Sequence, residues 1–332
     1  MTKLFVNDPK QFVPEFLEGI ALANPSTLTY DPKYNLIARA DAPSNDKVSI
    51  IQGSGSGHEP AHVLVVGKGM LDAAVPGDVF SAPPLEYVQE AIKRVASDKG
   101  ILLIVNNYTG DRLVFDMAQE IALADGMKVK TILVNDDVSV QDSTYTVGRR
   151  GVAGNFFVIK AVGAAAEEGA DLDELVRIGE KVNSVARSIG VGLTAPTPPA
   201  KGEPLFDLPA DEIEVGIGIH GEPGRRRAKI GSADEIVDEM LGAVVGDLPF
   251  VSGDRVAVQI NGMGGTPISE LYLLYGLVHK RLVAQGITVS RNYVGNYTTS
   301  LDAAGASITL VKLDEEIERL LAAPAEAGVH IF

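Results

Sequence analysis

The sequence has no cysteine among its 332 residues. This absence excludes disulfides, thiolate metal sites and a cysteine nucleophile, so any chemistry falls to histidine, carboxylate and hydroxyl side chains. Basic residues are also few: 29 Lys and Arg stand against 44 Asp and Glu, which leaves a net charge of −15. Because binding to a phosphate backbone needs a basic face, we expect no nucleic-acid partner.

Long apolar runs are missing as well. No stretch approaches the roughly 20 residues that span a bilayer, and residues 1–8 lack the apolar core and cleavage site of a secretion signal. The sequence therefore predicts a cytoplasmic protein with no membrane partner. The phosphate-binding pattern GxxxxGK[ST] is absent too, which excludes a P-loop.

A glycine-rich stretch, Gly53–Gly57, is followed directly by His58 and Pro60. The apolar run before it predicts a strand at 47–52, and Pro60 suits the first turn of a helix. Three glycines in five residues allow backbone N–H groups to approach a small ligand. The alternative is a tight turn that carries a surface histidine.

A second histidine, His220, has a similar setting. It follows a predicted strand at 212–219 that ends in glycines, and it precedes Gly221. The chain has five histidines, and two unrelated structural turns would seldom place two of them at glycine-rich strand ends. We therefore expect His58 and His220 to share one site.

The first half alternates strands and helices. The pattern predicts a helix within 84–99, a buried strand at 101–105, a helix at 112–125 and a strand at 129–134. Asp111 follows the buried strand, so we expect it at the same sheet edge as His58, where open α/β sheets bind ligands. Asp111 could at the same time cap the next helix.

Helices at 155–169 and 172–188 lead to a segment with four prolines, 194–204, which is a natural junction. The sequence thus predicts two α/β domains, 1–190 and 191–332, each a mainly parallel or mixed sheet flanked by helices. In the second half we expect helices and strands as follows: a helix at 233–245, a strand at 255–260, a helix at 267–285, strands at 288–294 and 307–312, and a terminal helix.

Three short patterns suggest functions that their context disfavours. Residues 216–221 match GxGxxG, but no apolar helix follows, as a dinucleotide site requires. Residues 58–62 match HExxH, yet Pro60 would interrupt the helix that zinc binding needs, so we expect no metal. The basic cluster 225–229 could receive a phosphate, although ion pairs with the acidic surface are the favoured interpretation.

Six ordered motifs together give the chain a specific resemblance over nearly its whole length. It resembles the K subunit of dihydroxyacetone kinases, in the motifs GSGHEP (55–60), VGKGMLDAAV (66–75), NYTGD (107–111), GRRGVAG (148–154), GIHGEPG (218–224) and TSLD (299–302).

This resemblance implies that His220 captures the ketone carbon of a short ketose as a hemiaminal. It also implies that His58 and Asp111 bind the hydroxyls and take the proton from the attacking hydroxyl. Covalent capture by a neutral imidazole would fix a small substrate in attack geometry. The further residues predicted to bind substrate are Gly55, Ser56, Gly57, Asn106 and Ala82.

No nucleotide-binding domain of the family has a counterpart here, so the resemblance implies that the chain itself binds no cofactor. A separate L-type subunit would bring ATP or ADP with Mg, a phosphotransferase-system protein could serve as donor, and the chain would form a homodimer. The alternative is a noncatalytic paralogue that binds the ketose to co-activate a transcription regulator.

The chain departs from the family pattern near the ligand. Asn106 stands where lysine is usual, Ala82 where serine is usual, Val114 where asparagine is usual, and Ser54 where one more glycine is usual. Loss of a lysine and a serine would remove hydrogen bonds and free volume. We therefore expect a ketose of four or five carbons, such as erythrulose, to be preferred to dihydroxyacetone.

Overall fold

A computed structural model describes residues 4–139 and 148–328. Within these residues the fold is α/β, with two six-stranded sheets, as predicted. The first sheet has the order β1-β2-β5-β3-β6-β7. Its strands are β1 (Leu28–Asp31), β2 (Leu36–Arg39), β3 (Ser49–Gln52), β5 (Ala73–Ala74), β6 (Ile101–Asn106) and β7 (Val129–Val134).

The second sheet has the order β10-β9-β8-β13-β11-β12. It is mostly antiparallel, and its one parallel pair is β11 with β12. Its strands are β8 (Ala186–Gly192), β9 (Glu212–Val215), β10 (Arg226–Lys229), β11 (Arg255–Gly262), β12 (Thr288–Gly295) and β13 (Gly305–Leu313). A small third sheet pairs β4 (Gly67–Lys68) with β14 (Glu326–Ala327) near the end of the described chain.

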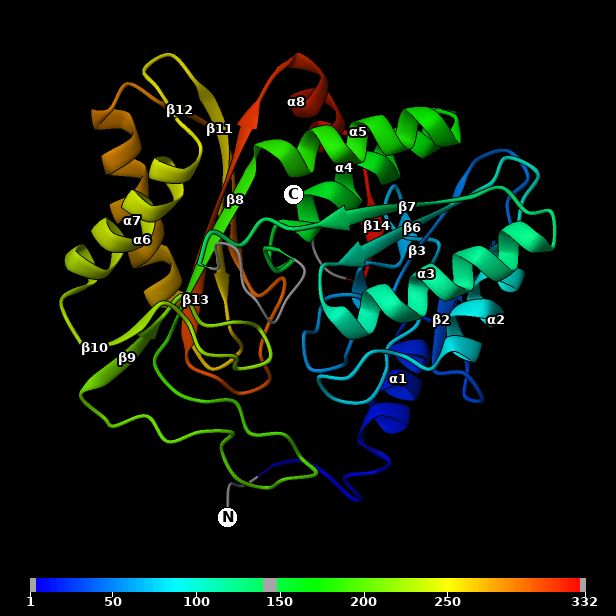
Figure 1. Cartoon of the computed structure of the whole chain (residues 1–332), viewed down its shortest axis with the longest axis horizontal. Helices are drawn as coiled ribbons and strands as arrows, with labels where there is room; N and C mark the ends of the chain where they lie inside the picture. The colour runs from blue at the N-terminus through cyan, green and yellow to red at the C-terminus, as the bar shows by residue number, and fades with distance from the viewer. Residues whose placement is uncertain (1–3, 140–147, 329–332) are drawn as a thin grey trace.

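Helices cover both sheets and also lie between them (Figure 1). Helices α2 (Leu85–Val95) and α3 (Thr109–Ala124) pack on the outer face of the first sheet, while α6 (Ala233–Asp247) and α7 (Ile268–Ala284) pack on the outer face of the second. The layer between the sheets holds α4 (Asn155–Glu167), α5 (Leu172–Val185) and α8 (Glu315–Ala322), and α1 (Phe12–Ala23) precedes β1.

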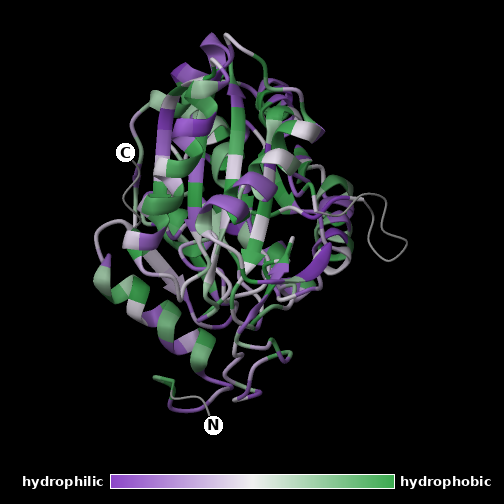
Figure 2. Cartoon of the chain, turned by 90° about the vertical axis from the view of Figure 1, so that its left-hand side faces the viewer, coloured by the Kyte–Doolittle hydropathy of each residue, from purple (hydrophilic) through white to green (hydrophobic). Residues whose placement is uncertain are grey.

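The helices form where the sequence supplies amphipathic spacing and caps. Ser232 and Glu235 make a capping box at the start of α6, and Asp171 and Asp314 accept backbone N–H groups at the starts of α5 and α8. The outer helices carry both polar and apolar residues (Figure 2). Helix α4 is instead buried almost throughout, because sheets and helices surround it.

Several element predictions differ from the structure. Strands β1 and β2, which lie within the first forty residues and precede the predicted strand at 47–52, were not predicted. No α-helix starts at Pro60, and only a short 3₁₀ turn (Val63–Val65) follows. Strand β9 ends at Val215 rather than 219, because Gly216 adopts a positive φ of 83°. Strands β8 and β10 were not predicted.

The predicted boundary near residue 190 falls inside β8. One hydrophobic core contains side chains from both halves of the chain, such as Ile104 and Val311, with α4 and α5 between them. The division into domains 1–190 and 191–332 stays a prediction.

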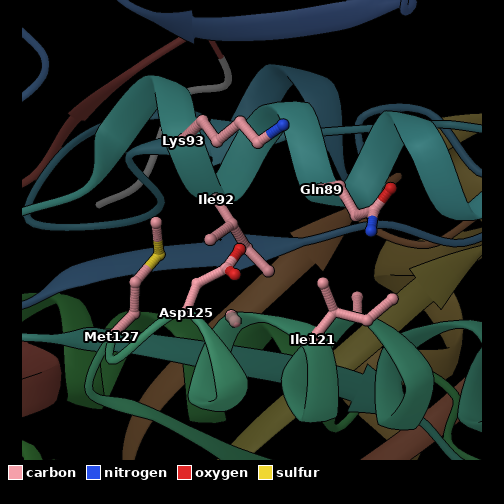
Figure 3. A pocket seen from close by; sticks show the side chains of 8 residues that line it. Gln89, Ile92, Lys93, Ile121, Asp125 and Met127 are labelled. Carbon is pink, nitrogen blue, oxygen red and sulfur yellow. The ribbon is translucent and has the colours of Figure 1, made fainter.

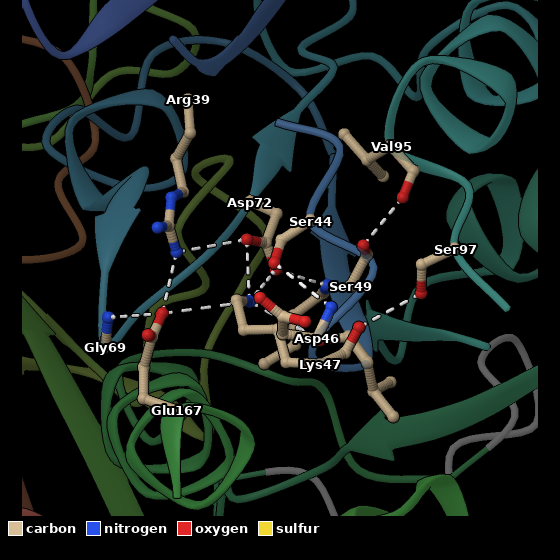
Figure 4. Close-up of polar contacts among 12 residues, drawn as sticks. Arg39, Ser44, Asp46, Lys47, Ser49, Gly69, Asp72, Val95, Ser97 and Glu167 are labelled. Atoms are coloured by element: carbon tan, nitrogen blue, oxygen red, sulfur yellow. Dashed lines mark hydrogen bonds and ion pairs between the residues drawn. The ribbon is translucent and has the colours of Figure 1, made fainter. Parts of the chain in front are cut away.

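A buried ion cluster holds the first sheet to α4 (Figure 4). Lys47 Nζ lies 2.6 Å from Asp72 Oδ2, and Arg39 Nη1 lies 3.2 Å from Asp72 Oδ1 and 2.7 Å from Glu167 Oε1. Asp72 also accepts the backbone N–H of Ile50. Each buried charge thus has an oppositely charged partner, and the cluster links β2, the start of β3 and α4, so that removing one partner would leave a buried charge uncompensated.

Among residues 4–139 and 148–328, no helix combines the length and the apolar character that crossing a bilayer requires.

Candidate active site

The two glycine-rich strand ends meet, as the sequence predicted. His58 follows β3 in the first sheet and His220 follows β9 in the second, and their ring centroids lie 4.8 Å apart. His58 is fully buried, while His220 retains some exposure. The site therefore lies where the carboxyl ends of two strands from different sheets converge.

Two aromatic rings complete this cluster. Phe80 stacks on His58 at 5.3 Å and packs edge-on to His220 at 5.4 Å, while Tyr108 packs edge-on to His220 at 4.6 Å. Sequence reasoning missed both as site residues. Tyr108 directly precedes α3 and its buried hydroxyl has no partner among the described residues, so it leaves a polar atom for a ligand.

The glycine loop permits this close approach. A Cβ on Gly55 would lie 2.6 Å from the backbone nitrogen of Ser81, and Gly57 has a φ of 100°. Both positions therefore require glycine, and both hold the loop against residues 80–81. Ser56 is buried there as well, and its hydroxyl donates to the Gly77 carbonyl at 2.6 Å.

The tautomer of His58 follows from its partner. Its Nδ1 lies 2.8 Å from the Thr299 carbonyl oxygen, which can only accept, so Nδ1 carries the proton. Nε2 is buried and unpaired among the described residues. Burial lowers the pKa of His58 well below its usual value, and repulsion from His220 adds to this effect. His58 therefore offers a neutral nitrogen that can accept a proton or a hydrogen bond.

His220 is oriented by Glu222, two residues further on. The His220 Nδ1 lies 2.7 Å from Glu222 Oε1, and the His220 backbone N–H donates to Glu222 Oε2 at 3.0 Å. Burial alone would raise the pKa of Glu222, but His220 and Arg150 outweigh it and hold that pKa at about 2. The ionised Glu222 thus keeps the proton of His220 on Nδ1 and leaves Nε2 as a lone-pair donor.

Asp111 lies in the first turn of α3, whose N-cap is Tyr108, so the suggestion that Asp111 caps this helix is wrong. Its Oδ2 accepts from Ser54 Oγ at 2.8 Å, and its buried Oδ1 has no partner among the described residues. Burial raises the pKa of Asp111 to about 6, although Ser54 and His220 oppose the rise. Such a carboxylate is suited to general-base work near neutral pH.

Not all of the residues at which the chain departs from the family pattern lie near this set. Asn106 ends β6 and is fully buried, and its Nδ2 is unpaired among the described residues. Ala82 lies against the start of α3, since a Cβ on Gly110 would be 3.3 Å from its Cβ. Val114 instead packs on the core beneath α2 and α3.

The structure places each of the three misleading patterns. Strand β10, not a helix, follows the GxGxxG match at 216–221. In the basic cluster, Arg226 pairs with Glu239, Arg227 with Glu214, and Lys229 with Asp211, which confirms the ion-pair interpretation. His58 and His62 do not share a helix, and the described residues contain no group of three metal-ligating side chains.

A pocket between α2 and α3 is a separate feature (Figure 3). Ile92 and Lys93 line it from α2, and Ile121 and Asp125 face them from the far end of α3. Ile121 is ten residues beyond Asp111, which corresponds to about 15 Å along a helix. The pocket therefore does not belong to the histidine site.

The Dak1 domain matches residues 18–329, and the chain belongs to this family of dihydroxyacetone-binding kinase subunits. It is 44% identical to the dihydroxyacetone-binding subunit DhaK of the PEP-dependent dihydroxyacetone kinase of Escherichia coli (strain K12), a match that covers 97% of each protein.

Other relatives differ in length and in the function that their names give. The chain is 39% identical to a D-erythrulose kinase of Mycolicibacterium smegmatis, over 99% of this chain but 56% of that protein. The crystal structure of the dihydroxyacetone kinase of C. freundii superposes with a TM-score of 0.90 at 35% identity, over 99% of this chain and 60% of that one. The operon co-activator DhaQ also superposes with a TM-score of 0.90 at 35% identity, over 95% and 97%.

Proposed function

We propose that this chain is the ketose-binding subunit of a kinase of the dihydroxyacetone kinase type and that it holds its substrate covalently on His220. The observation that carries the proposal is the hydrogen bond from His220 Nδ1 to Glu222, because it leaves the lone pair on Nε2. A neutral imidazole with a free Nε2 is a nucleophile toward a carbonyl carbon.

In the proposed capture step, the Nε2 lone pair forms a bond to the ketone carbon and the carbonyl π pair moves to oxygen. The Nδ1 proton moves to Glu222, and the new alkoxide takes a proton from solvent. Glu222 then passes the proton that it received to solvent. The net change adds the imidazole N–H across the C=O bond. Glycerol lacks a carbonyl and cannot react in this way.

For phosphoryl transfer, the terminal hydroxyl of the bound ketose loses its proton as it attacks phosphorus. Asp111 Oδ1 and His58 Nε2 are both buried acceptors without a partner in the described chain, and we assign them to the substrate hydroxyls. The carboxylate of Asp111 takes the proton, because a pKa of about 6 leaves it mostly ionised at pH 7 and above.

The proposal includes a partner. The chain spans only 56–60% of the relatives that are single-chain kinases, and an L-type subunit would supply the remaining part with ATP or ADP and Mg. Relatives whose names include "PEP-dependent" and "PTS-dependent" support a phosphotransferase-system donor. We also propose a homodimer. ATP alone should therefore not bind the isolated chain stoichiometrically, as calorimetry can test.

For the substrate we propose a short ketose, either dihydroxyacetone or a C4 or C5 ketose. The family includes relatives named as erythrulose kinases, which supports the larger substrates. Asn106 and Ala82 border the site and replace the larger or charged residues that are usual there. The test compares dihydroxyacetone with D- and L-erythrulose and pentuloses under one partner and one donor. A kcat/KM highest for dihydroxyacetone would contradict the preference for a longer ketose.

The covalent step has a direct test in the isolated chain. Intact-protein mass spectrometry and a ketose-soaked crystal should show an adduct on His220, and His220→Ala should lose the adduct and bind ketose more weakly. Lys130→Met is the control that should keep the adduct, because Lys130 belongs to an exposed ion pair with Asp173, remote from the site. Unchanged ketose affinity in His220→Ala would refute the assignment.

A second candidate is a ketose-sensing co-activator, which the equal superposition on DhaQ favours. Such a protein would bind ketose without passing phosphate to it. A coupled assay with a purified L-type partner separates the two, since only the kinase subunit would form ketose phosphate.

A further inference from the structure

A chain of three buried polar side chains runs beside the proposed ketose site. His62 Nδ1 lies 2.7 Å from Gln52 Oε1, and Gln52 Nε2 lies 3.4 Å from Asn106 Oδ1. All three side chains are at most 2% exposed. Two of them, Gln52 and Asn106, end the neighbouring parallel strands β3 and β6. These three hydrogen-bonded side chains therefore lie at the strand ends that lead into the glycine loop and α3.

The direction of this chain follows from which atoms can donate. Gln52 Oε1 can only accept, so His62 donates from Nδ1, and Asn106 Oδ1 can only accept, so Gln52 donates to it. Burial lowers the pKa of His62 to about 3, so its ring is neutral and carries a single N–H. Every acceptor oxygen is thus engaged, and the chain ends at the Asn106 Nδ2, which has no partner among the described residues.

Both strand ends that carry this hydrogen-bond chain adjoin the reacting groups. Tyr108, two residues beyond Asn106, packs edge-on to His220 at 4.6 Å. Ser54, two residues beyond Gln52, donates to Asp111. A buried N–H pair that stays unpaired costs free energy, so a ligand oxygen at this place is favoured.

We propose that Gln52 and His62 are positioning residues that orient the Asn106 amide with its N–H₂ toward the ketose, so that this wall of the site donates hydrogen bonds and does not accept them. This inference rests on the proposed function of the same site. It selects a substrate that places an oxygen, as hydroxyl or carbonyl, against Asn106, and it disfavours deoxy analogues that place a methyl group or hydrogen there.

The decisive variant is Gln52→Glu, which keeps the size of the side chain. Both oxygens of the ionised carboxylate only accept, so at a pH high enough to ionise this buried group the variant still accepts from His62 Nδ1 but draws the Asn106 N–H₂ away from the site and turns Oδ1 toward the ligand. We expect the dissociation constants of dihydroxyacetone and L-erythrulose, measured by calorimetry on the isolated chain, to rise about tenfold or more.

Gln52→Leu removes the connection altogether and should weaken ketose binding as well. Its matched control is Gln259→Leu, because Gln259 is an equally buried strand glutamine of β11 that makes no side-chain hydrogen bond within the described residues. The control should leave both dissociation constants unchanged. Unchanged ketose binding in a folded Gln52→Glu protein would overturn the proposal.

A second measurement does not depend on any variant folding. The ¹⁵N NMR shifts of His62 in the wild-type protein should show the proton on Nδ1. A proton on Nε2 would mean that the chain runs in the opposite direction, with Asn106 presenting its oxygen, and would also overturn the proposal. If the wild-type protein binds no ketose while His62 keeps its proton on Nδ1, the proposed function fails, but the direction of the hydrogen bonds from His62 through Gln52 to Asn106 stands.

Discussion

Ser54 offers a sharp test of the electrostatics of the site. Its hydroxyl donates to Asp111 Oδ2 at 2.8 Å, and this bond opposes the rise in pKa that burial imposes on Asp111. Ser54→Ala removes one bond from the carboxylate and leaves its burial intact. The pKa of Asp111, about 6 in the native chain, should therefore rise further.

The magnitude follows from the strength of the bond. A hydrogen bond to a charged group contributes roughly 1.5–3 kcal/mol, and about 1.4 kcal/mol corresponds to a change of one in pKa, so the pKa of Asp111 should reach about 7 to 8. At pH 6 the ionised fraction of Asp111 would then fall from about a half to about a tenth or less, and kcat/KM should fall with it. Above about pH 9 the variant and the native protein should perform alike.

Two assays check this expectation. A ¹³C NMR titration of the Asp111 carboxyl in the isolated chain reads the pKa directly, and the pH profile of kcat/KM with a partner subunit reads its consequence. Ser49→Ala is the matched control, because Ser49 is also buried in this segment but donates to the Val95 carbonyl at 2.6 Å. A pKa of Asp111 that stays the same or falls in Ser54→Ala would refute the reasoning.

Two further predictions concern stability. The folded pKa of Asp111, about 6, exceeds its ordinary value of 3.8, so its ionisation destabilises the fold above pH 6 and not below about pH 4. Asp111→Asn should therefore abolish ketose phosphorylation yet raise the free energy of unfolding by roughly 2–3 kcal/mol at pH 7. Urea unfolding should show that this gain vanishes at pH 4, and a loss of stability at pH 7 would contradict the expectation. Lys47→Met leaves the buried Asp72 with one cation fewer and should destabilise by about 3 kcal/mol. The exposed counterpart, Lys130→Met, should cost under about 1 kcal/mol, and equal losses in chemical denaturation would argue against a role for burial.

Much of the fold was readable from the order of residues. The run at 101–105 is apolar at every position, which is typical of a strand buried on both faces, and β6 is such a strand. The helices α6 and α7 follow amphipathic spacing and were placed within two residues of their ends. Short strands such as β1, β8 and β10 escaped prediction, because four to seven residues carry too little pattern to separate a strand from a loop or a helix end.

The two histidines, the aspartate and the glycine loop could be named in advance, since each follows a strand within a distinctive local pattern. Their chemical states could not. The proton on His220 Nδ1 depends on Glu222, and the pKa of Asp111 depends on how deeply its own side chain is buried and on the hydroxyl of Ser54. Residues 58 and 299 are 241 positions apart in the chain, yet their contact sets the tautomer of His58. Local sequence determines which groups are available for chemistry, whereas burial and long-range hydrogen bonds, which exist only once both sheets have assembled, set where each proton lies.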